Sequence, residues 1–358
     1  MAGGLDGGPA GVADHFLAMQ AQDFPASSWA LGLRSGSTLV DVERAYHSGR
    51  IVRSWPMRGT IHLTPAQDVG WLRDLTSAKA LGAPAERRRS NLGLTLGRVE
   101  TVREAVIETL TGGAALPRDV LLEAVSARGV RIEDHWRYHL IWFLAQTGTL
   151  VLGPIQDGRP SLVLANEWIA NPRRLERDEA LAELAARYVN SHGPAQADDL
   201  AWWSGLGKRD VAKALNLAGD RVTQLNGEDG GTYWVSPALA GSQAISGVAL
   251  LPAFDELLLG YRDRSLTLDR AQASAVCPGG NGVFKPVVVA NGICVGTWRA
   301  PARGALKKLA IDQPVPVAVT WFNKESSRLA ARPLVAAAAN RYARYLGRRR
   351  AAVTTVTA

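Results

Sequence analysis

The sequence predicts an α+β protein in which tandem helix-turn-helix units, each followed by a β-hairpin, precede a β-rich C-terminal domain. The same order of helix, turn, second helix and alternating strands recurs three times before residue 240. Beyond about residue 242, short apolar runs separated by Gly, Pro and Asn replace the helical pattern, which indicates strands. A chain of 358 residues is also too long for one ordinary compact core, so several modules are expected.

The first unit is expected over residues 1–64. Residues 38–47 carry apolar side chains at helical spacing behind Thr38, whose hydroxyl suits a helix N-cap, and Ser48-Gly49 ends the pattern. Residues 50–55 and 59–63 flank a proline and alternate as strands do, which predicts a hairpin. A helical pair followed by such a hairpin is a winged helix, with the hairpin as its wing.

The same plan is predicted for residues 65–176. Pro117 suits the first position of a helix, and the basic stretch at residues 86–89 is expected to form a loop. The predicted elements are helices at residues 65–81, 99–110, 117–126 and 136–146, followed by wing strands at 149–152 and 161–164.

A third unit is predicted over residues 177–240. The turn Ser204-Gly-Leu-Gly207 separates two helical patterns, and the second of these is basic. The predicted elements are helices at residues 181–190, 195–203 and 208–215 and wing strands at 221–225 and 231–235.

The C-terminal domain is predicted over residues 241–358. Strands are expected at residues 248–251, 287–289, 293–295 and 315–319, and a terminal helix at about 326–346. The tail that follows carries Arg348-Arg349-Arg350, which we expect to be solvated.

Composition favours a cytoplasmic protein with a polyanionic partner such as nucleic acid. Lys and Arg total 41 against 33 Asp and Glu, and the sequence pI near 9.8 suits a polyanionic partner. Cys277 and Cys294 form neither a disulfide framework nor a zinc pattern. The N-terminus lacks the basic and apolar regions of a signal peptide, and no apolar run is long enough to span a membrane.

Gln20 and Gln22 are the candidate catalytic residues. Residues two apart share a face only in an extended segment, so the two amides can converge only if the preceding helix ends near Met19. Pro25 favours such an end. Extended glutamines could hold one water between their carbonyl oxygens, whereas on a helix they would be ordinary surface residues. Asp23 would face away from Gln22, which favours capping or pairing over catalysis.

Five short motifs together resemble the AlkZ/YcaQ-like winged-helix DNA glycosylases, and they occur in the order of that family along nearly the whole chain. The motifs are Gln20-Ala-Gln22-Asp23, Ser54-Trp55 to Arg58-Gly-Thr-Ile-His62, Gly193-Pro194 with Trp202-Trp203-Ser-Gly-Leu206, Leu251-Pro-Ala-Phe-Asp255 with Gly260-Tyr-Arg-Asp-Arg264, and Val295-Gly-Thr-Trp-Arg299.

The resemblance implies a monofunctional DNA glycosylase that hydrolyses the N-glycosidic bond of N7-alkylated purines in double-stranded DNA, with crosslink unhooking in some members. It implies catalysis by a Gln-x-Gln or Gln-x-Asp motif, and this chain has the Gln-x-Gln form of the AlkZ-like branch. An N7-alkylguanine is cationic and leaves as a neutral base, so the enzyme's tasks are to stabilise an oxocarbenium-like sugar and to position water. A crosslinked base cannot be flipped, so we expect the glutamines to line an open groove without a deep pocket.

Eight residues are predicted to contact DNA: Arg53, Arg58, His62, Lys208, Arg209, Lys213, Arg262 and Arg264. Six of them have an alternative: His62 as a hydrogen-bonded core histidine, Lys208, Arg209 and Lys213 as a solvated helix face, and Arg262 and Arg264 in pairs with Asp263. Trp55 is expected to pack, and of Trp202 and Trp203 one is expected to face the core and the other its rim.

No cofactor and no metal are expected. His135 and His139 have a helical i,i+4 spacing that suits zinc, but they lack further ligands at useful spacing. Two other functions are compatible with the scaffold, namely a non-catalytic winged-helix regulator and a protein–protein adaptor. The two amides disfavour the regulator and the basic balance disfavours the adaptor. A monomer is expected, because a regulator would dimerise to match DNA half-sites, whereas this chain carries three modules itself.

Overall fold

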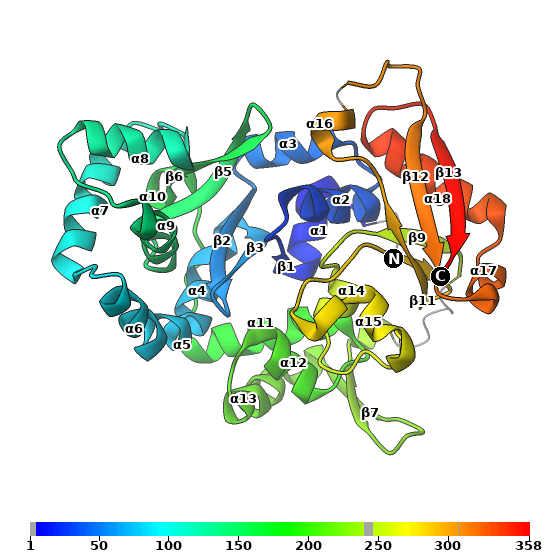
Figure 1. The fold of residues 1–358 in the computed structure, drawn as a ribbon. Helices are drawn as coiled ribbons and strands as arrows, with labels where there is room; N and C mark the ends of the chain where they lie inside the picture. The colour runs from blue at the N-terminus through cyan, green and yellow to red at the C-terminus, as the bar shows by residue number, and fades with distance from the viewer. Residues whose placement is uncertain (1–4, 240–245, 307) are drawn as a thin grey trace.

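The computed structural model describes residues 5–239, 246–306 and 308–358, which form a mixed arrangement of helices and β-sheets (Figure 1). The predicted order of helix, helix and hairpin is present three times within residues 5–239. No helix in the described ranges is long and apolar enough to cross a membrane.

The N-terminal unit places a very short strand between two helices. Thr38 caps the third helix as predicted, and Asp41 completes a capping box with it. The elements are α1 (Gly8–Phe16), β1 (Met19–Gln20), α2 (Phe24–Ser35), α3 (Leu39–His47), β2 (Ile51–Met57) and β3 (Thr60–Pro65).

The second unit contains the predicted helices and hairpin, with one correction. Residues 86–89, predicted as a loop, lie in α6, where Ala85 is the buried residue. Helix α6 is polar nearly all round and shows no apolar stripe, so a prediction from hydrophobic periodicity does not detect it. The elements are η1 (Ala66–Asp68), α4 (Val69–Thr76), α5 (Ala78–Leu81), α6 (Ala83–Asn91), α7 (Leu96–Leu110), β4 (Leu116–Pro117), α8 (Arg118–Ala127), η2 (Asp134–Trp136), α9 (Arg137–Gln146), β5 (Leu150–Gln156), β6 (Arg159–Leu164) and α10 (Ala165–Trp168).

The hairpins of these two units belong to one sheet. Its strand order is β1-β3-β2-β5-β6-β4, and β2 meets β5 through the antiparallel pair Arg53 and Leu152. β1 is an edge strand, paired antiparallel to β3 with Met19 opposite Leu63 and Gln20 opposite His62. The first two units are therefore continuous through their wings.

The third unit lies below β1 in the view of Figure 1. Trp203 is completely buried and Trp202 is 45% exposed, which confirms the predicted division between core and rim. The elements are α11 (Arg177–His192), α12 (Ala197–Ser204), α13 (Lys208–Ala218), η3 (Gly219–Arg221), β7 (Thr223–Asn226), β8 (Thr232–Val235) and η4 (Pro237–Leu239).

The C-terminal part is a five-stranded sheet of order β13-β12-β11-β10-β9, with α18 against it. The predicted terminal helix is followed by a further strand, β13, which pairs parallel to β12. The expectation of a solvated tail is confirmed for Arg349 and Arg350, which are exposed, and is corrected for Arg348, which donates hydrogen bonds to the carbonyls of Leu306 and Leu309 at 3.0 and 3.2 Å. The elements are β9 (Val248–Leu251), α14 (Glu256–Leu259), η5 (Arg270–Gln272), α15 (Ala273–Val276), η6 (Pro278–Gly280), β10 (Val287–Ala290), β11 (Ile293–Arg299), α16 (Arg303–Leu306), β12 (Val315–Trp321), α17 (Lys324–Leu329), α18 (Arg332–Tyr345) and β13 (Ala351–Thr357).

Two large apolar cores meet at the Gln20 segment. One core joins both N-terminal units to the C-terminal sheet and includes Met19 and Ala21. The other joins α4 to α11, α12 and α13 and includes Leu17 and Ala18. Residues 17–21 therefore cross from one core to the other, which anchors the segment on both sides.

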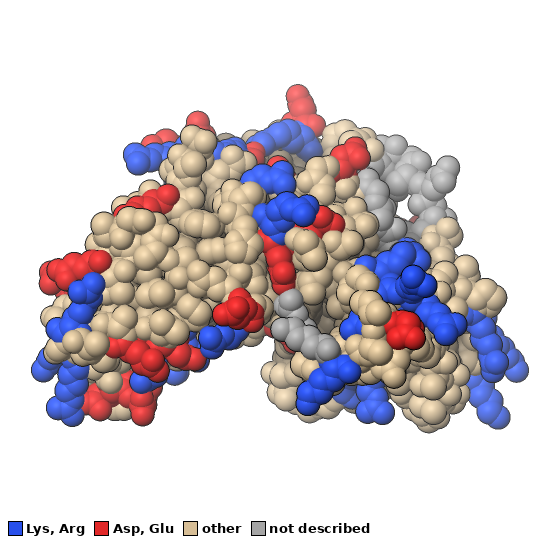
Figure 2. All heavy atoms as spheres, turned by 90° about the horizontal axis from the view of Figure 1, so that it is seen from above, with Lys and Arg blue, Asp and Glu red and all other residues tan. Residues whose placement is uncertain are grey.

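Surface charge is unevenly distributed on the face shown in Figure 2. Lys and Arg gather over the right-hand part, where the C-terminal sheet and helices lie, whereas both signs are mixed on the left. This agrees with the formal net charge of +8.

Candidate active site

The helix before the glutamines ends in a strained turn. Leu17 adopts φ 61° and ψ −50°, and the N–H of Ala18 donates to the carbonyl of Phe16 at 2.7 Å. This is the geometry of a classic γ-turn, which is rare for a residue with a side chain. Pro25, which we expected to end the helix, instead lies in the first turn of α2. The buried Leu17 side chain holds the turn in place.

The segment after Leu17 is extended, as the glutamine spacing required. Met19 and Ala21 are 1% and 0% exposed, whereas Gln20 is partly exposed and Gln22 is exposed. This alternation is that of a strand with one face in the core. The two amides therefore lie on the outer side of a segment whose other side chains are fixed.

The carbonyl oxygens of both glutamines accept backbone hydrogen bonds. Gln20 Oε1 accepts from the Gln22 N–H at 2.6 Å, and Gln22 Oε1 accepts from the Ile61 N–H at 3.3 Å. The amide nitrogens of both side chains have no partner within the described part of the chain. Each carbonyl oxygen keeps a second lone pair, so both amides are oriented without being saturated.

Asp23 performs the capping role expected of it. Its Oδ1 accepts from the Ala26 N–H at 3.0 Å, which caps α2. The first turn of α2 is therefore fixed directly behind Gln22.

Glu256 is a residue of the site that the sequence analysis missed. It is 3% exposed, lies in α14, and its Oε1 accepts the Gln20 N–H at 2.6 Å. β1 is an edge strand, and this N–H points to its unpaired side, away from β3, so no strand offers it an acceptor. An acidic residue at the start of the apolar run Leu257-Leu258-Leu259 was the available signal, because a buried carboxylate requires dedicated partners.

The second oxygen of Glu256 is also engaged. Its Oε2 accepts the Trp203 indole N–H at 3.1 Å and lies 3.5 Å from His192 Nε2. Burial acts to raise the pKa of this carboxyl, but His192 and the Gln20 N–H outweigh burial and lower the pKa below its ordinary value. Glu256 is therefore an anion that ties β1 to the third unit and to the C-terminal part.

Two predicted DNA contacts lie inside the fold instead. Arg53 is 4% exposed, donates to the carbonyl of Ala21 at 2.6 Å, and covers the Phe24 ring. His62 is completely buried, with Nδ1 3.0 Å from the carbonyl of Thr60. Burial and the nearby Arg58 lower the pKa of His62 to about 4, so it is neutral at pH 7. Arg53 supports the Gln20 segment through the Ala21 carbonyl, and His62 supports it from β3, where it lies opposite Gln20.

Arg58 is exposed at the tip of the β2–β3 hairpin and lines a groove of about 650 Å³, here called the basic groove. None of the described side chains along this groove is acidic. Its charged and aromatic lining residues are Arg58, Lys79, Arg88, Tyr138, His139, Trp142 and Trp202. Cations interleaved with aromatic faces suit a nucleic-acid strand.

The other predicted DNA contacts are exposed or partly exposed, and three of the five already pair with acidic groups. Lys208 and Arg262 both contact Asp198, and Lys213 lies 2.5 Å from Asp178. Arg209 is exposed on α13. Arg264 lies over the rings of Trp202 and Phe284 and donates to the carbonyl of Leu258. Arg262 therefore pairs with Asp198 and not with Asp263, the partner that was expected.

Trp55, His135 and His139, which the sequence analysis singled out, each contact other parts of the fold. Trp55 is 4% exposed, as expected. His139 is buried and stacks on Trp142 with ring centroids 5.2 Å apart, and His135 Nε2 lies 3.3 Å from the carbonyl of Leu92.

Comparison with known proteins identifies the family of this chain. The family model for AlkZ-like DNA glycosylases matches residues 13–345. An interstrand DNA cross-link repair glycosylase of Streptomyces sahachiroi is 26% identical over 305 residues, which is 80% of this chain and 81% of that protein. The solved structure of the Streptomyces sahachiroi DNA glycosylase AlkZ matches with a TM-score of 0.77 and 25% identity, over 98% of this chain and 95% of the other.

The fold, the site and these matches define an enzyme of the DNA glycosylase class. The chain belongs to the AlkZ-like DNA glycosylase family. Of the functions left open by the sequence, the non-catalytic regulator and the adaptor are therefore not favoured.

Proposed function

We propose that this protein is a monofunctional glycosylase that hydrolyses the N-glycosidic bond of N7-alkylated purines in duplex DNA, with a water positioned by Gln20 and Gln22. The carrying observation is that both glutamines project from one short extended segment and that a backbone N–H fixes each carbonyl oxygen. Crosslinked purines fall in the same substrate class, and the Streptomyces relative is described as acting on crosslinks.

The geometry supports this chemistry through pre-organisation. Each glutamine oxygen retains one lone pair that can accept a hydrogen from water, and the partial negative charge of the amides faces the site where an oxocarbenium-like sugar would form. Because an N7-alkylguanine leaves as a neutral base, no general acid is required on the leaving group. Fixed amides then suffice in place of a carboxylate.

The surroundings suit a duplex that cannot be flipped. Gln22 is exposed, and neither glutamine lines the basic groove or the larger cavity of about 790 Å³ beside α2. The prediction of an open groove without a deep pocket stays part of the proposal, although neither of these two hollows is lined by Gln20 or Gln22. Arg58 and the basic groove would hold the phosphate backbone.

The test is base release from duplex DNA that carries either N7-methylguanine or a nitrogen-mustard crosslink, with alkali used to cleave the resulting abasic sites. We expect release by the wild-type protein and a loss of at least 100-fold in the Gln20→Ala/Gln22→Ala variant, on the order of the effect of removing pre-organised transition-state contacts. Release that persists in the double variant would refute the catalytic assignment. Tight DNA binding without release from either substrate would refute the proposed function.

A further inference from the structure

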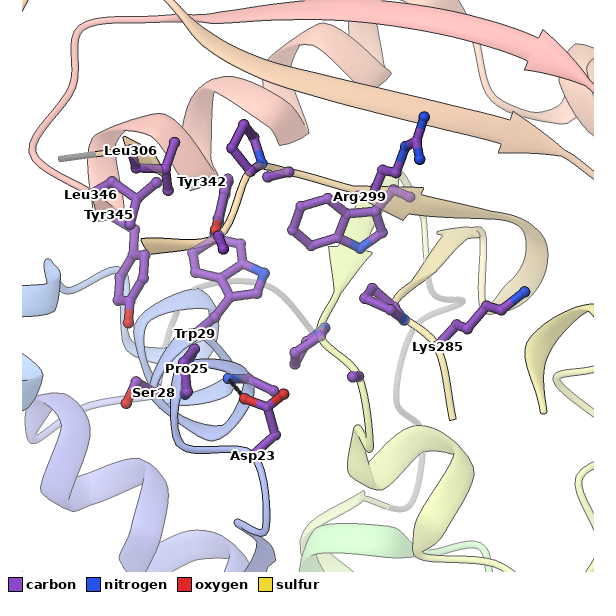
Figure 3. A pocket seen from close by; sticks show the side chains of 18 of the residues that line it. Asp23, Pro25, Ser28, Trp29, Lys285, Arg299, Leu306, Tyr342, Tyr345 and Leu346 are labelled. Carbon is purple, nitrogen blue, oxygen red and sulfur yellow. Dashed lines mark hydrogen bonds between the residues drawn. The ribbon is translucent and has the colours of Figure 1, made fainter. Parts of the chain in front are cut away.

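An aromatic cavity lies between the N-terminal unit and the C-terminal sheet. It has a volume of about 790 Å³ and is lined from α2, the turn after β9, β11, β12 and α18 (Figure 3). Neither Gln20 nor Gln22 lines it, so the cavity is a site apart from the glutamine motif. A cavity of this volume is typical of sites that bind a small molecule.

The walls of the cavity form one aromatic cluster around Tyr342. The ring centroids of Trp29 and Trp298 lie 5.1 and 5.0 Å from that of Tyr342, and all three residues line the cavity. The two indole N–H groups donate to the carbonyls of Leu250 and Leu251 at 2.8 and 2.7 Å. Because these polar edges are satisfied, the tryptophans offer the cavity apolar ring surface, which suits an aromatic ligand.

One polar group in the α2 wall lacks a hydrogen-bond partner. Ser28 lines the cavity and is completely buried, but its hydroxyl has no partner within the described part of the chain. The hydroxyl of the neighbouring Ser27, in contrast, donates to the carbonyl of Phe24 at 3.1 Å. Buried hydroxyl groups normally have a partner, and a ligand with a hydrogen-bonding atom would supply one.

The free charge at the cavity is positive. Lys285 and Arg299 line the cavity and are exposed, and their charged ends point away from the aromatic rings in Figure 3. Neither forms an ion pair within the described chain, whereas Lys208 and Lys213 do. The acidic residue among the described lining residues is Asp23, which is engaged as the cap of α2. The two cations therefore favour an anionic group at this side of the cavity.

We propose that this cavity binds a small aromatic organic anion, with its rings between the aromatic walls and its anionic group beside Lys285 and Arg299. An uncharged aromatic molecule would gain nothing from the two cations. Duplex DNA could touch the cations, but its bases are stacked and paired, so it would leave the aromatic walls empty. The inference goes beyond the proposed function and does not depend on it.

The experiment compares two fluorescent probes that differ by one anionic group, namely anilinonaphthalene sulfonate and its uncharged analogue phenylnaphthylamine. Both probes are titrated against the whole protein, and their affinities are taken from the rise in probe fluorescence. The titration with the sulfonate is repeated in the presence of undamaged duplex DNA. Circular dichroism confirms that each variant is folded.

One set of variants tests the aromatic walls. Thr297→Trp on β11 and Ala318→Trp on β12 fill the cavity from two neighbouring strands. Thr355→Trp on the exposed edge strand β13 is the matched control, because it adds the same ring away from the cavity lining. If Thr297→Trp does not fold, Ala318→Trp gives the same comparison from another strand.

A second set of variants tests the cations. Lys285→Gln/Arg299→Gln removes both positive charges at the cavity. Arg87→Gln/Lys324→Gln is the matched control, because it removes one lysine and one arginine that are exposed and do not line the cavity. The two double variants have the same net charge, so a difference between them reports the position of the charges.

Wild type and both controls should bind the sulfonate about five- to tenfold more tightly than the uncharged probe, the effect of two exposed ion pairs. Lys285→Gln/Arg299→Gln should lose this preference and bind the uncharged probe with an affinity changed less than twofold. Each filled variant should bind both probes at least tenfold more weakly, and duplex DNA should not displace the sulfonate.

Three results would overturn the proposal. Wild-type affinity for the probes in the filled variants would place the probes elsewhere on the protein. Equal affinity of the wild type for both probes, or the same loss of preference in both double variants, would show that the two cations do not select an anion. Displacement of the sulfonate by duplex DNA would assign this surface to DNA instead of to a small molecule.

Discussion

Glu256 accepts the edge N–H of Gln20 and so holds its main chain, whereas the side-chain oxygen of Gln20 accepts the Gln22 N–H. Glu256→Gln keeps the shape but turns an amide nitrogen toward at least one of the donors from Gln20 and Trp203. Leaving such a buried donor unsatisfied costs about 1–3 kcal/mol. If that cost falls on the Gln20 segment, we expect kcat for N7-methylguanine release to fall about 10- to 100-fold, with DNA affinity changed less than about twofold.

The matched control is Trp203→Phe. It removes the indole donor to Glu256 but leaves the contact between Glu256 and Gln20. We expect it to lower the free energy of unfolding, since Trp203 is completely buried, and to leave kcat nearly unchanged. Equal losses of kcat in both variants would mean that Glu256 acts through general stability instead of through Gln20.

His62 gives the fold a defined sensitivity to acid. Its pKa is lowered from 6.5 to about 4 by burial and by Arg58, so the unfolded chain takes up this proton at a higher pH than the folded protein does. Stability is therefore complete above about pH 6.5 and declines as the pH falls toward 4, by about 3 kcal/mol at most for this group. The measurement is the free energy of unfolding in urea, for the wild type and for His62→Gln, between pH 7 and pH 4. If this free energy declines as steeply with falling pH in His62→Gln as in the wild type, the assignment to His62 is contradicted.

Helix α6 supplies a test of the basic groove. Arg88 lines the groove, whereas its neighbour Arg87 is equally exposed and does not. If the groove holds phosphate groups, Arg88→Ala should reduce the slope of log affinity against log salt by about 0.9, the effect of one phosphate contact. Arg87→Ala should change that slope much less. Identical slopes for the two variants, measured by anisotropy on undamaged duplex, would remove the groove from the DNA path.

Local sequence signals were sufficient where one face of an element is buried and the other is not. The extended Met19–Gln20 segment was predicted because two amides two residues apart share a face only in extended backbone, and the Thr38 cap was predicted because capping depends on neighbouring residues. Local sequence signals failed for α6, which buries one residue, and for β13, whose side chains are mostly exposed. Arg53 and His62 were predicted to contact DNA because the sequence shows charge and alternation but does not show how deeply a side chain is buried.

Long-range contacts set the remainder of the site, and these lie beyond the reach of local patterns. The Gln20 N–H meets Glu256 across 236 residues, and Arg34 meets Asp255 across 221 residues. The first two predicted units also share one sheet, and they share one apolar core with the C-terminal sheet instead of standing as separate modules. The Gln20 segment lies where these units join, so its geometry depends on contacts from several of them.

The Arg34–Asp255 ion pair shows how strongly the N-terminal and C-terminal parts depend on each other. Arg34 in α2 donates to both oxygens of Asp255 at 2.9 and 2.8 Å, and both side chains are almost completely buried. Removing one partner of a buried pair leaves an uncompensated charge and costs about 3–5 kcal/mol. Asp255→Asn and Arg34→Met should each destabilise by about this amount in urea.

The double variant separates the pair from the packing around it. Asp255 caps α14 by accepting from the Leu257 N–H, and the side-chain oxygen that Asp255→Asn introduces can accept the same hydrogen bond. Arg34→Met/Asp255→Asn therefore removes both charges and keeps the cap. We expect it to be more stable than either single variant, with a coupling free energy of at least about 2 kcal/mol. Because the core is shared, tryptophan fluorescence and far-ultraviolet circular dichroism should report one coincident transition. The expectation is contradicted if the losses of unfolding free energy in the two single variants add up in the double variant. It is also contradicted if two unfolding transitions appear and the variants shift only one of them, since the N-terminal and C-terminal parts would then unfold independently.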